Sequence, residues 1–202
     1  MGTLDYYQKN AKEFFSQTIN VDMQNVYHPF LEYLPKTHLS NQQKILDVGC
    51  GSGRDSVFFA NQGFEVVAID GSKSLIELAQ QTDTRIDWQC LRFDEIAKQS
   101  WQNQFTGIWA CASLLHVAFD DLPKILNDLL SCLRPTGILY ASFKYGNRER
   151  KKEGRFFCDI NEQRWRIVES QLISTKPLKV WQTVDNRMDK RDIWWNILYC
   201  KN

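Results

Sequence analysis

Apolar and polar residues follow one another along this chain in blocks that predict alternating strands and helices. Five short apolar runs predict strands, at residues 45–48, 64–70, 86–91, 105–112 and 136–143. Helical patterns follow the first, second and fourth of these runs, and a further helix that contains Trp165 is predicted after the fifth. The run at residues 105–112 lacks polar alternation, which is typical of a central strand covered on both faces. The pattern therefore predicts an α/β fold with a parallel sheet between layers of helices.

Both ends of the chain depart from this alternation. Residues 5–18 and 23–34 place apolar side chains at helical spacing and predict two helices ahead of the first strand. Residues 178–184 and 193–200 predict two final strands, joined by the polar turn 185–191. This turn is too short for a crossover helix, so the last pair is predicted to be an antiparallel hairpin.

Composition narrows the class of protein. The chain has 202 residues and shows no linker-like segment, so we expect a single domain. Its 25 Lys and Arg residues against 24 Asp and Glu residues give a net charge of +1, which makes nucleic acid an unlikely partner and provides no general attraction to an anionic membrane. Six scattered cysteines without a C-x-x-C pair indicate buried thiols in a reducing compartment. The sequence shows no signal peptide and no apolar run long enough to span a membrane, so we expect a soluble, cytoplasmic protein. The sequence does not specify the oligomeric state.

The stretch from Lys44 to Asp70 carries the most informative motif. Its first strand leads into Gly49-Cys50-Gly51-Ser52-Gly53, a helical pattern follows, and the second strand ends at Asp70. Alternate glycines let the backbone turn tightly and approach a ligand, at a helix N-terminus whose amide groups are unpaired. An acid about 20 residues beyond the first glycine is placed to accept hydrogen bonds from ribose hydroxyls.

The spacing of the glycines argues against a dinucleotide. A dinucleotide loop needs Gly-x-Gly-x-x-Gly, whereas here the third glycine is Gly53 and the sixth position is Arg54. Asp47 would also bring negative charge near a bound phosphate, so a cationic, amino-acid-bearing ligand fits better. The alternative is a glycine-rich connection that only turns the chain.

The DVGCGSGRD run resembles the first motif of class I S-adenosylmethionine-dependent methyltransferases. The resemblance implies one Rossmann-like methyltransferase domain over residues 1–202, with a helical lid at 1–40, a core at 41–202 and sheet order 3-2-1-4-5-7-6. It implies S-adenosyl-L-methionine as the cofactor and S-adenosyl-L-homocysteine as the product. The cofactor-binding residues that it implies are Tyr7, Thr18, Asp47, Gly49, Cys50, Gly51, Ser52, Gly53, Asp70, Gly71, Ser72, Phe93, Asp94, Cys111, Ala112 and Ser113.

Several of these assignments have a structural alternative. In the family, an acid after the third strand binds the adenine amino group beside an apolar residue, which matches Phe93 and Asp94. Asp94 could instead cap a helix. Tyr7 and Thr18 match a lid over the cofactor, but the aromatic residues of this segment could simply pack on the sheet.

Residues after the fourth and fifth strands are candidates for the acceptor site. The Ser113-Leu114-Leu115-His116-Val117 block resembles the fourth motif of small-molecule methyltransferases, and His116 and Tyr145 are candidate proton acceptors. Within the charged run from Lys144 to Arg155, the cations Lys144, Arg148 and Arg155 could hold an anionic substrate, or the run could be a solvated loop. No metal site is expected.

The sequence therefore predicts a methyltransferase that acts on a small molecule. The GCGSGRDS loop is similar to that of tellurite-resistance-related methyltransferases, which implies a small oxyanion or thiol-like acceptor. Motifs for methylation of DNA bases, Asn-Pro-Pro-Tyr, Asp-Pro-Pro-Tyr and Pro-Cys, do not occur. The alternatives are an NAD-binding oxidoreductase, a non-catalytic protein of methyltransferase fold that binds a cofactor or partner, and an RNA methyltransferase.

Overall fold

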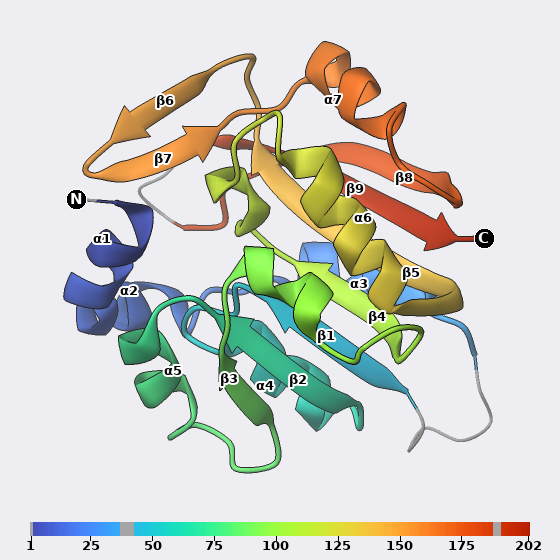
Figure 1. Cartoon of the computed structure of the whole chain (residues 1–202). Helices are drawn as coiled ribbons and strands as arrows, with labels where there is room; N and C mark the ends of the chain where they lie inside the picture. Colours follow the sequence, from blue (N-terminus) through green and yellow to red (C-terminus); the bar gives the residue numbers. More distant parts are fainter. Residues whose placement is uncertain (1, 37–42, 188–190) are drawn as a thin grey trace.

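A seven-stranded sheet forms the centre of the molecule, in the order β3-β2-β1-β4-β5-β9-β8 (Figure 1). The computed structural model describes residues 2–36, 43–187 and 191–202. Strands β1 to β5 are parallel, and β9 runs antiparallel to both β5 and β8, so the predicted sheet order is confirmed. The strands of this sheet are β1 (Lys44–Val48), β2 (Glu65–Asp70), β3 (Asp87–Cys90), β4 (Phe105–Ala110), β5 (Leu133–Lys144), β8 (Thr175–Val184) and β9 (Ile193–Lys201).

Helices cover both faces of the sheet because its central strands are apolar on both sides. Neighbours Ile108 and Trp109 on β4 are both fully buried, yet they belong to separate hydrophobic clusters. Helices α6 (Leu122–Cys132) and α7 (Glu162–Glu169) pack on the near face in Figure 1, and α3 (Gln24–Tyr33) and α4 (Arg54–Asn61) lie behind the sheet. This two-sided burial is what the unbroken apolar run in β4 predicted.

The N-terminal segment forms three helices instead of the two predicted. Helices α1 (Thr3–Lys9) and α2 (Ala11–Thr18) are separated at Asn10, whose backbone leaves the helical region at φ −106° and ψ 21°. The Gln8 side chain then bonds the hydroxyls of Ser72 and Ser74 at the start of α5 (Lys73–Ala79). These contacts place α1 and α2 beside the carboxyl ends of the parallel strands, at the left of Figure 1.

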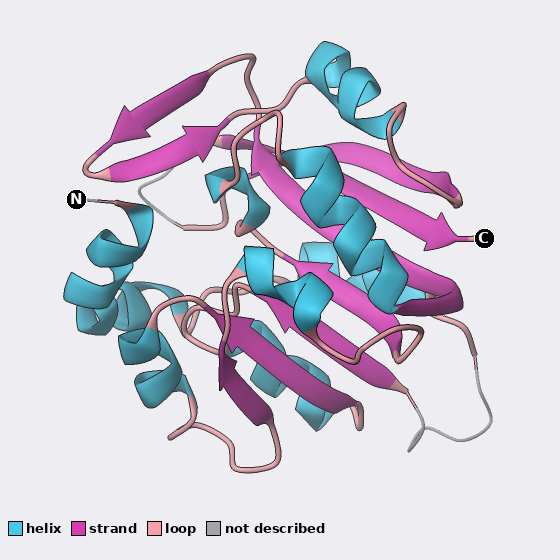
Figure 2. Cartoon of the chain, in the orientation of Figure 1, coloured by secondary structure: helices cyan, strands magenta, loops and turns pink. Residues whose placement is uncertain are grey.

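The charged run after β5 forms a second, two-stranded sheet. Strands β6 (Glu149–Lys152) and β7 (Arg155–Cys158) are antiparallel and form the small hairpin seen in Figure 2. The alternative that this charged run is a solvated loop was therefore wrong. Glu153 and Gly154 both adopt positive φ, 53° and 77°, as a two-residue hairpin turn requires. A Glu-Gly pair is a weak signal for such a turn, and the first strand carries no apolar alternation.

Among the described residues, two short segments form 3₁₀ helices, Phe93–Lys98 and Leu114–His116. Each follows the carboxyl end of a parallel strand, β3 and β4 respectively. Within the described ranges, every helix is too short or too polar to cross a membrane.

Candidate cofactor and acceptor site

Two adjoining cavities lie at the carboxyl edge of the parallel strands. Cavity A has a volume of about 650 Å³, and cavity B has a volume of about 740 Å³. Both are lined by the glycine loop, α1, α2 and the segment after β4 through the shared residues Tyr7, Phe14, Gly49, Gly51, Ala112 and His116. The two cavities therefore form one cleft between the N-terminal helices and the edge of the sheet.

The glycine loop leaves no space for side chains at its closest points. A Cβ atom at Gly49 would lie 2.4 Å from the Ser113 Cβ atom, and one at Gly51 would lie 3.0 Å from the Phe14 ring. Both residues have positive φ, 73° and 56°. The loop is therefore restricted to glycine at these positions by its backbone conformation and by its neighbours.

Asp70 lies where the loop and the end of β2 meet. Its Oδ2 atom accepts a hydrogen bond of 3.0 Å from the Gly51 amide, and Oδ1 accepts one of 2.8 Å from the Ser72 amide. Burial raises the pKa of Asp70 to about 6, although these two amide donors act in the opposite direction. The carboxyl group lines cavity B and is held rigidly at its wall.

Ser113 and Phe93 line cavity B together with Asp70. The Ser113 hydroxyl oxygen is buried and has no hydrogen-bond partner among the described residues. A buried hydroxyl without a partner is costly and is expected to bond a ligand. Asp94 also lines cavity B, but its carboxylate is largely exposed and forms an ion pair of 3.0 Å with Arg92.

Three predicted residues, Asp47, Gly53 and Ser72, are not among the described residues that line the two cavities. The Asp47 carboxyl is 1% exposed and accepts a hydrogen bond from the Ser56 hydroxyl, and burial together with the nearby Asp55 charge raises its pKa well above the usual range. Gly53 precedes α4 and faces Trp88, and Ser72 caps α5. The structure thus gives these three residues contacts that support the loop.

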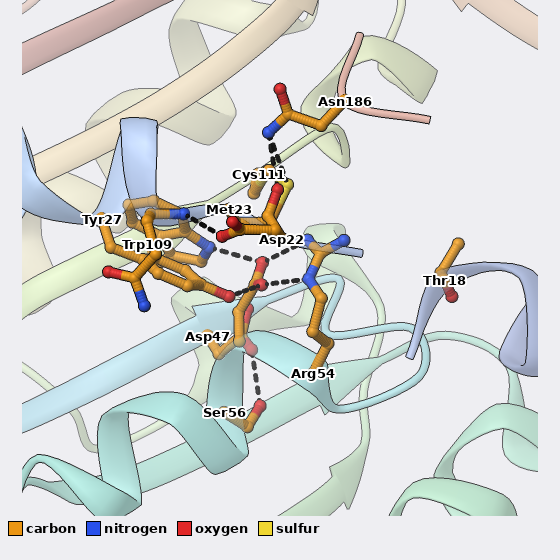
Figure 3. A network of polar contacts seen from close by, with 12 residues as sticks. Thr18, Asp22, Met23, Tyr27, Asp47, Arg54, Ser56, Trp109, Cys111 and Asn186 are labelled. Atoms are coloured by element: carbon orange, nitrogen blue, oxygen red, sulfur yellow. Dashed lines mark hydrogen bonds and ion pairs between the residues drawn. The ribbon is translucent and has the colours of Figure 1, made fainter. Parts of the chain in front are cut away.

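A buried polar network that we did not predict adjoins the loop (Figure 3). Asp55 accepts hydrogen bonds from the Tyr27 hydroxyl at 2.5 Å, from Trp109 Nε1 at 2.8 Å, and from Arg54 Nε and Nη2 at 2.6 and 3.0 Å. Burial alone would raise the pKa of Asp55, but the Arg54 charge and these donors hold it below its usual value. The sequence signal for this network is the Arg54-Asp55 pair directly after the third glycine.

His116 is held between the hairpin and helix α1. Its Nδ1 atom lies 2.6 Å from the Phe156 carbonyl oxygen, which can only accept, so Nδ1 carries the proton. Nε2 then accepts from the Tyr7 hydroxyl at 2.9 Å. Burial lowers the pKa of His116 to about 4, and the Arg155 and Lys144 charges act in the same direction. The imidazole is therefore neutral at physiological pH.

Cations and aromatic rings form the far end of cavity A. The Lys144 ammonium lies 5.5 Å from the Phe157 ring centre and 5.7 Å from that of Trp194, and it pairs with Asp192. The Arg155 guanidinium lies 4.3 Å from the Tyr6 ring centre, and its Nε atom is buried without a partner in the described structure.

The structure separates the remaining predicted residues into two groups. Tyr145 is 39% exposed and donates a hydrogen bond to Glu162, and Arg148 is exposed, so neither belongs to the described cavity walls. The predicted residues that line the cleft are Tyr7, Thr18, Gly49, Cys50, Gly51, Ser52, Asp70, Gly71, Phe93, Asp94, Cys111, Ala112, Ser113, His116, Lys144 and Arg155.

Wall residues that sequence reasoning missed include members of the N-terminal helices and of the turn after β8. Tyr6 and Phe14 come from α1 and α2, where we had named only Tyr7 and Thr18. Asn186 and Arg187 come from the turn after β8, and Asn186 also donates to the Asp22 carbonyl between α2 and α3 (Figure 3). No local pattern in the sequence indicates that this turn reaches the N-terminal helices.

Comparison with known proteins agrees with the resemblance of the glycine loop to a methyltransferase motif. Residues 45–137 match a family model described as a methyltransferase domain. The ubiquinone biosynthesis O-methyltransferase of Rickettsia typhi is 30% identical over 130 residues, which cover 59% of this chain and 50% of that protein. The chain thus spans about half the length of the curated relatives it matches.

Solved structures share the fold over nearly the whole chain. The 1,6-didemethyltoxoflavin-N1-methyltransferase of Burkholderia thailandensis, with bound 1,6-didemethyltoxoflavin and S-adenosylhomocysteine, has a TM-score of 0.74 and 18% identity, covering 98% of this chain and 85% of that one. The [4+2]-cyclase SpnF has a TM-score of 0.71 and 14% identity, covering 99% and 96%. The fold is therefore the Rossmann-like fold of methyltransferases.

Proposed function

We propose that this protein is an S-adenosylmethionine-dependent methyltransferase that acts on a small molecule. The observation that carries the proposal is the meeting of Asp70 and the glycine loop at one cleft, joined by the bond from the Gly51 amide to the carboxylate. Gly49 and Gly51 line the cleft while packed against Ser113 and Phe14, so neither position accepts a side chain. The methyltransferase-domain match spans this loop and Asp70.

The described cleft has groups suited to each part of the cofactor. Asp70 would accept from the ribose hydroxyls, and the unpartnered Ser113 hydroxyl and the Phe93 ring would contact the adenosine half in cavity B. The amides of Gly49, Cys50, Gly51 and Gly53 already donate within the protein, contrary to the unpaired amides expected from the sequence. The Ser52 backbone and the Thr18 side chain would face the amino-acid half in cavity A. When bound, S-adenosylmethionine supplies a methyl group on a positively charged sulfur, which is an electrophile with a good leaving group.

The protein's own task is then to position the acceptor and exclude water. Tyr7 and Phe14 line both cavities, so α1 and α2 border the place where the two halves of the cofactor would meet. His116 lies at the same point, but a neutral imidazole with a pKa of about 4 is a weak base at physiological pH. We assign His116 the role of a positioning residue that accepts from the Tyr7 hydroxyl.

The acceptor that fits cavity A best is a small anion. Arg155 has a buried Nε–H without a described partner. Lys144 and Arg155 both lie near the Phe157 ring, at 5.5 and 5.3 Å from its centre. Lys144 pairs with Asp192, and Arg155 Nη2 pairs with Glu153 at 2.5 Å. The buried Arg155 Nε–H is the donor that would be left for an anionic acceptor. The proposal includes two such acceptors, an anionic metabolite and a tellurite-like oxyanion. The oxyanion is supported only by the similarity of the glycine loop to that of tellurite-resistance-related methyltransferases.

A non-catalytic protein of this fold is the second candidate. SpnF, described as a [4+2]-cyclase, shows that the fold is not tied to one reaction. Methyl transfer is therefore tested by turnover as well as by binding. An RNA methyltransferase is less well supported, because the net charge of +1 provides little attraction to a polyanion.

The direct test is calorimetric titration with S-adenosylmethionine and S-adenosylhomocysteine, followed by turnover with a metabolite pool. We expect both to bind and NADH not to bind. Gly51→Ala should weaken binding by at least about tenfold, since its Cβ atom would meet Phe14 and its positive φ adds strain of about 1–3 kcal/mol. Gly63→Ala is the matched control, because Gly63 also has positive φ but its Cβ atom would meet open space.

Absence of binding at millimolar cofactor, with the protein folded, would refute the proposal. Binding without formation of S-adenosylhomocysteine across the metabolite pool would favour the non-catalytic candidate.

A further inference from the structure

Strand β8 is one edge of the seven-stranded sheet, and its outer side pairs with no described residue (Figure 1). Exposed edges usually carry features that prevent further strand pairing, such as proline, lysine and bulges. In β8 these features lie in the first half, where Pro177 and Lys179 flank a register shift against β9. The second half, from Val180 to Val184, has no charged residue and no proline. This half is therefore able to accept another strand.

The backbone groups of this second half point outwards at alternate residues. The Asp185 amide donates at 2.9 Å to the carbonyl oxygen of Asp192, directly before β9, so the Asp185 backbone faces β9. Bonded and non-bonded positions alternate along an antiparallel ladder, so the N–H and C=O groups of Val180, Gln182 and Val184 face away from β9. These three positions provide for about six hydrogen bonds to a further antiparallel strand.

Apolar side chains gather on one face of the same region. Among the described residues, eight large apolar side chains are exposed, and four of them lie here: Tyr145, Val180, Val184 and Ile193. Val184 is the register partner of Ile193, whose carbonyl oxygen accepts from the Tyr145 amide, so these three residues are neighbours. Val180 lies on the same face of β8, since side chains alternate along a strand. A contiguous apolar patch beside an unpaired strand edge is typical of an interaction surface.

We propose that two copies of this chain form a dimer by antiparallel pairing of their β8 strands, about a two-fold axis at Gln182. In this register Val180 of each copy lies opposite Val184 of the other, so the apolar side chains meet on one face. All three outward positions then bond to the second copy. An axis at Val180 would bring the proline and the bulge into the pairing, and an axis at Val184 would bring in the turn after β8.

The opposite face of β8 fits the same axis. Trp181 of one copy lies opposite Thr183 of the other, and Lys179 lies opposite Asp185. The two copies of Lys179 are thereby kept apart, and each is placed beside a carboxylate. The strand is complementary to itself in shape and charge, as a two-fold interface requires. Because β8 leads directly into the turn that lines cavity A, the dimer would also hold this part of the cavity wall in place.

Sedimentation of the full chain from about 1 to 100 µM tests the dimer. At the highest concentration we expect twice the 23.7 kDa mass of one chain. Gln182→Lys and Gln182→Glu each place two like charges opposite one another at the axis, so each should raise the dimer dissociation constant at least about tenfold. An equimolar mixture of the two variants places unlike charges there and should restore the constant to within about threefold of the native value.

Gln89→Lys and Gln89→Glu are the matched controls, since Gln89 lies on β3, at the opposite edge of the sheet. They should leave the dimer unchanged. A native protein that is still monomeric at about 100 µM overturns the proposal and leaves the β8 edge to a different partner. A native dimer that both Gln182 variants preserve, or that the mixture of variants does not restore, overturns this interface.

Hydrogen exchange on the native protein provides a second measurement that needs no substitution. The amides of Val180, Gln182 and Val184 should exchange at least about tenfold more slowly at concentrations where the dimer forms than in dilute monomer. Equal exchange rates for these amides in monomer and dimer would place the interface elsewhere and overturn the proposal.

Discussion

Three carboxyl groups around the glycine loop have different proton affinities although all are buried. Asp70 has only amide donors, so burial prevails and its pKa rises to about 6. Asp55 faces a guanidinium, which holds its pKa low, and Asp47 faces a hydroxyl and another acid, which leaves its pKa high. At the scale of single residues, the partner and not the depth of burial decides the charge.

The raised pKa of Asp70 predicts that cofactor affinity depends on pH. Above about pH 6 the carboxylate is ionised and accepts from ribose hydroxyls, and below that pH it is protonated and loses this capacity. We expect the dissociation constant of S-adenosylhomocysteine to rise as pH falls through 6, by up to about tenfold per pH unit. Calorimetry between pH 5 and 8 at roughly constant ionic strength measures this dependence.

Asp70→Asn should bind more weakly at pH 8 and show a flatter dependence, because an amide does not titrate. An equally steep dependence in this variant would assign the titration to another group.

At the scale of elements, helix α1 is fastened to three separate parts of the core. Gln8 bonds the start of α5, the Thr3 hydroxyl accepts from the Phe156 amide of β7, and Tyr7 donates to His116 in the 3₁₀ helix after β4. Since Tyr7 lines both cavities, these contacts set how α1 covers the cleft. His116 therefore connects α1 with the β6–β7 hairpin through Tyr7 and the Phe156 carbonyl.

Replacement of His116 distinguishes a positioning residue from a general base. Gln can still accept from the Tyr7 hydroxyl, so His116→Gln should keep about a tenth or more of the native turnover. His116→Phe leaves the Tyr7 hydroxyl without its acceptor, which costs about 1–3 kcal/mol and should weaken S-adenosylhomocysteine about tenfold. Turnover and calorimetry on both variants provide the measurement. A loss of about a hundredfold or more in both variants would instead identify His116 as a base.

At the scale of the whole molecule, the acceptor end of cavity A is assembled from distant parts of the chain. Tyr6 comes from α1, Lys144 from β5, Arg155 from β7 and Trp194 from β9. The hairpin β6–β7 brings Arg155 back over Tyr6, at 4.3 Å from the ring centre. In the proposed acceptor site, substrate preference would depend on the β6–β7 hairpin, which lies between β5 and β8 in the chain, together with the N-terminal helices.

This arrangement predicts a preference for anionic acceptors that depends on Arg155. In a panel of carboxylates and their amides, with selenite and tellurite included, we expect turnover of the anions to exceed that of the amides by about tenfold or more. Arg155→Met should raise KM for the anions about tenfold without changing the affinity for S-adenosylhomocysteine.

Arg148→Met, on the same segment but outside the described cavity walls, should behave like the native protein. Preference for the amides, or an unchanged KM in Arg155→Met, would contradict the anionic acceptor.

Sequence patterns alone predicted where the strands lie, and the resemblance of the glycine loop to a methyltransferase motif supplied the strand order and the expected cofactor-binding residues. The period of apolar residues and the spacing from Gly49 to Asp70 are local features, and they fix where strands end and which side chains follow them. Two-sided burial of β4 and the antiparallel final hairpin follow from the same local patterns.

Tertiary structure decided what local patterns do not contain. It turned Asp47 towards Ser56, placed Tyr145 and Arg148 outside the described cavity walls, folded the charged run into a hairpin and joined Arg54 to Tyr27 and Trp109 through Asp55. These contacts link residues from different elements, and the sequence encodes them only through the packing of the whole chain. The glycine loop could be predicted from the sequence because its chemistry lies within 27 consecutive residues, Lys44 to Asp70. The proposed acceptor end could not be predicted, because its residues meet only after the sheet, the hairpin and the N-terminal helices have packed together.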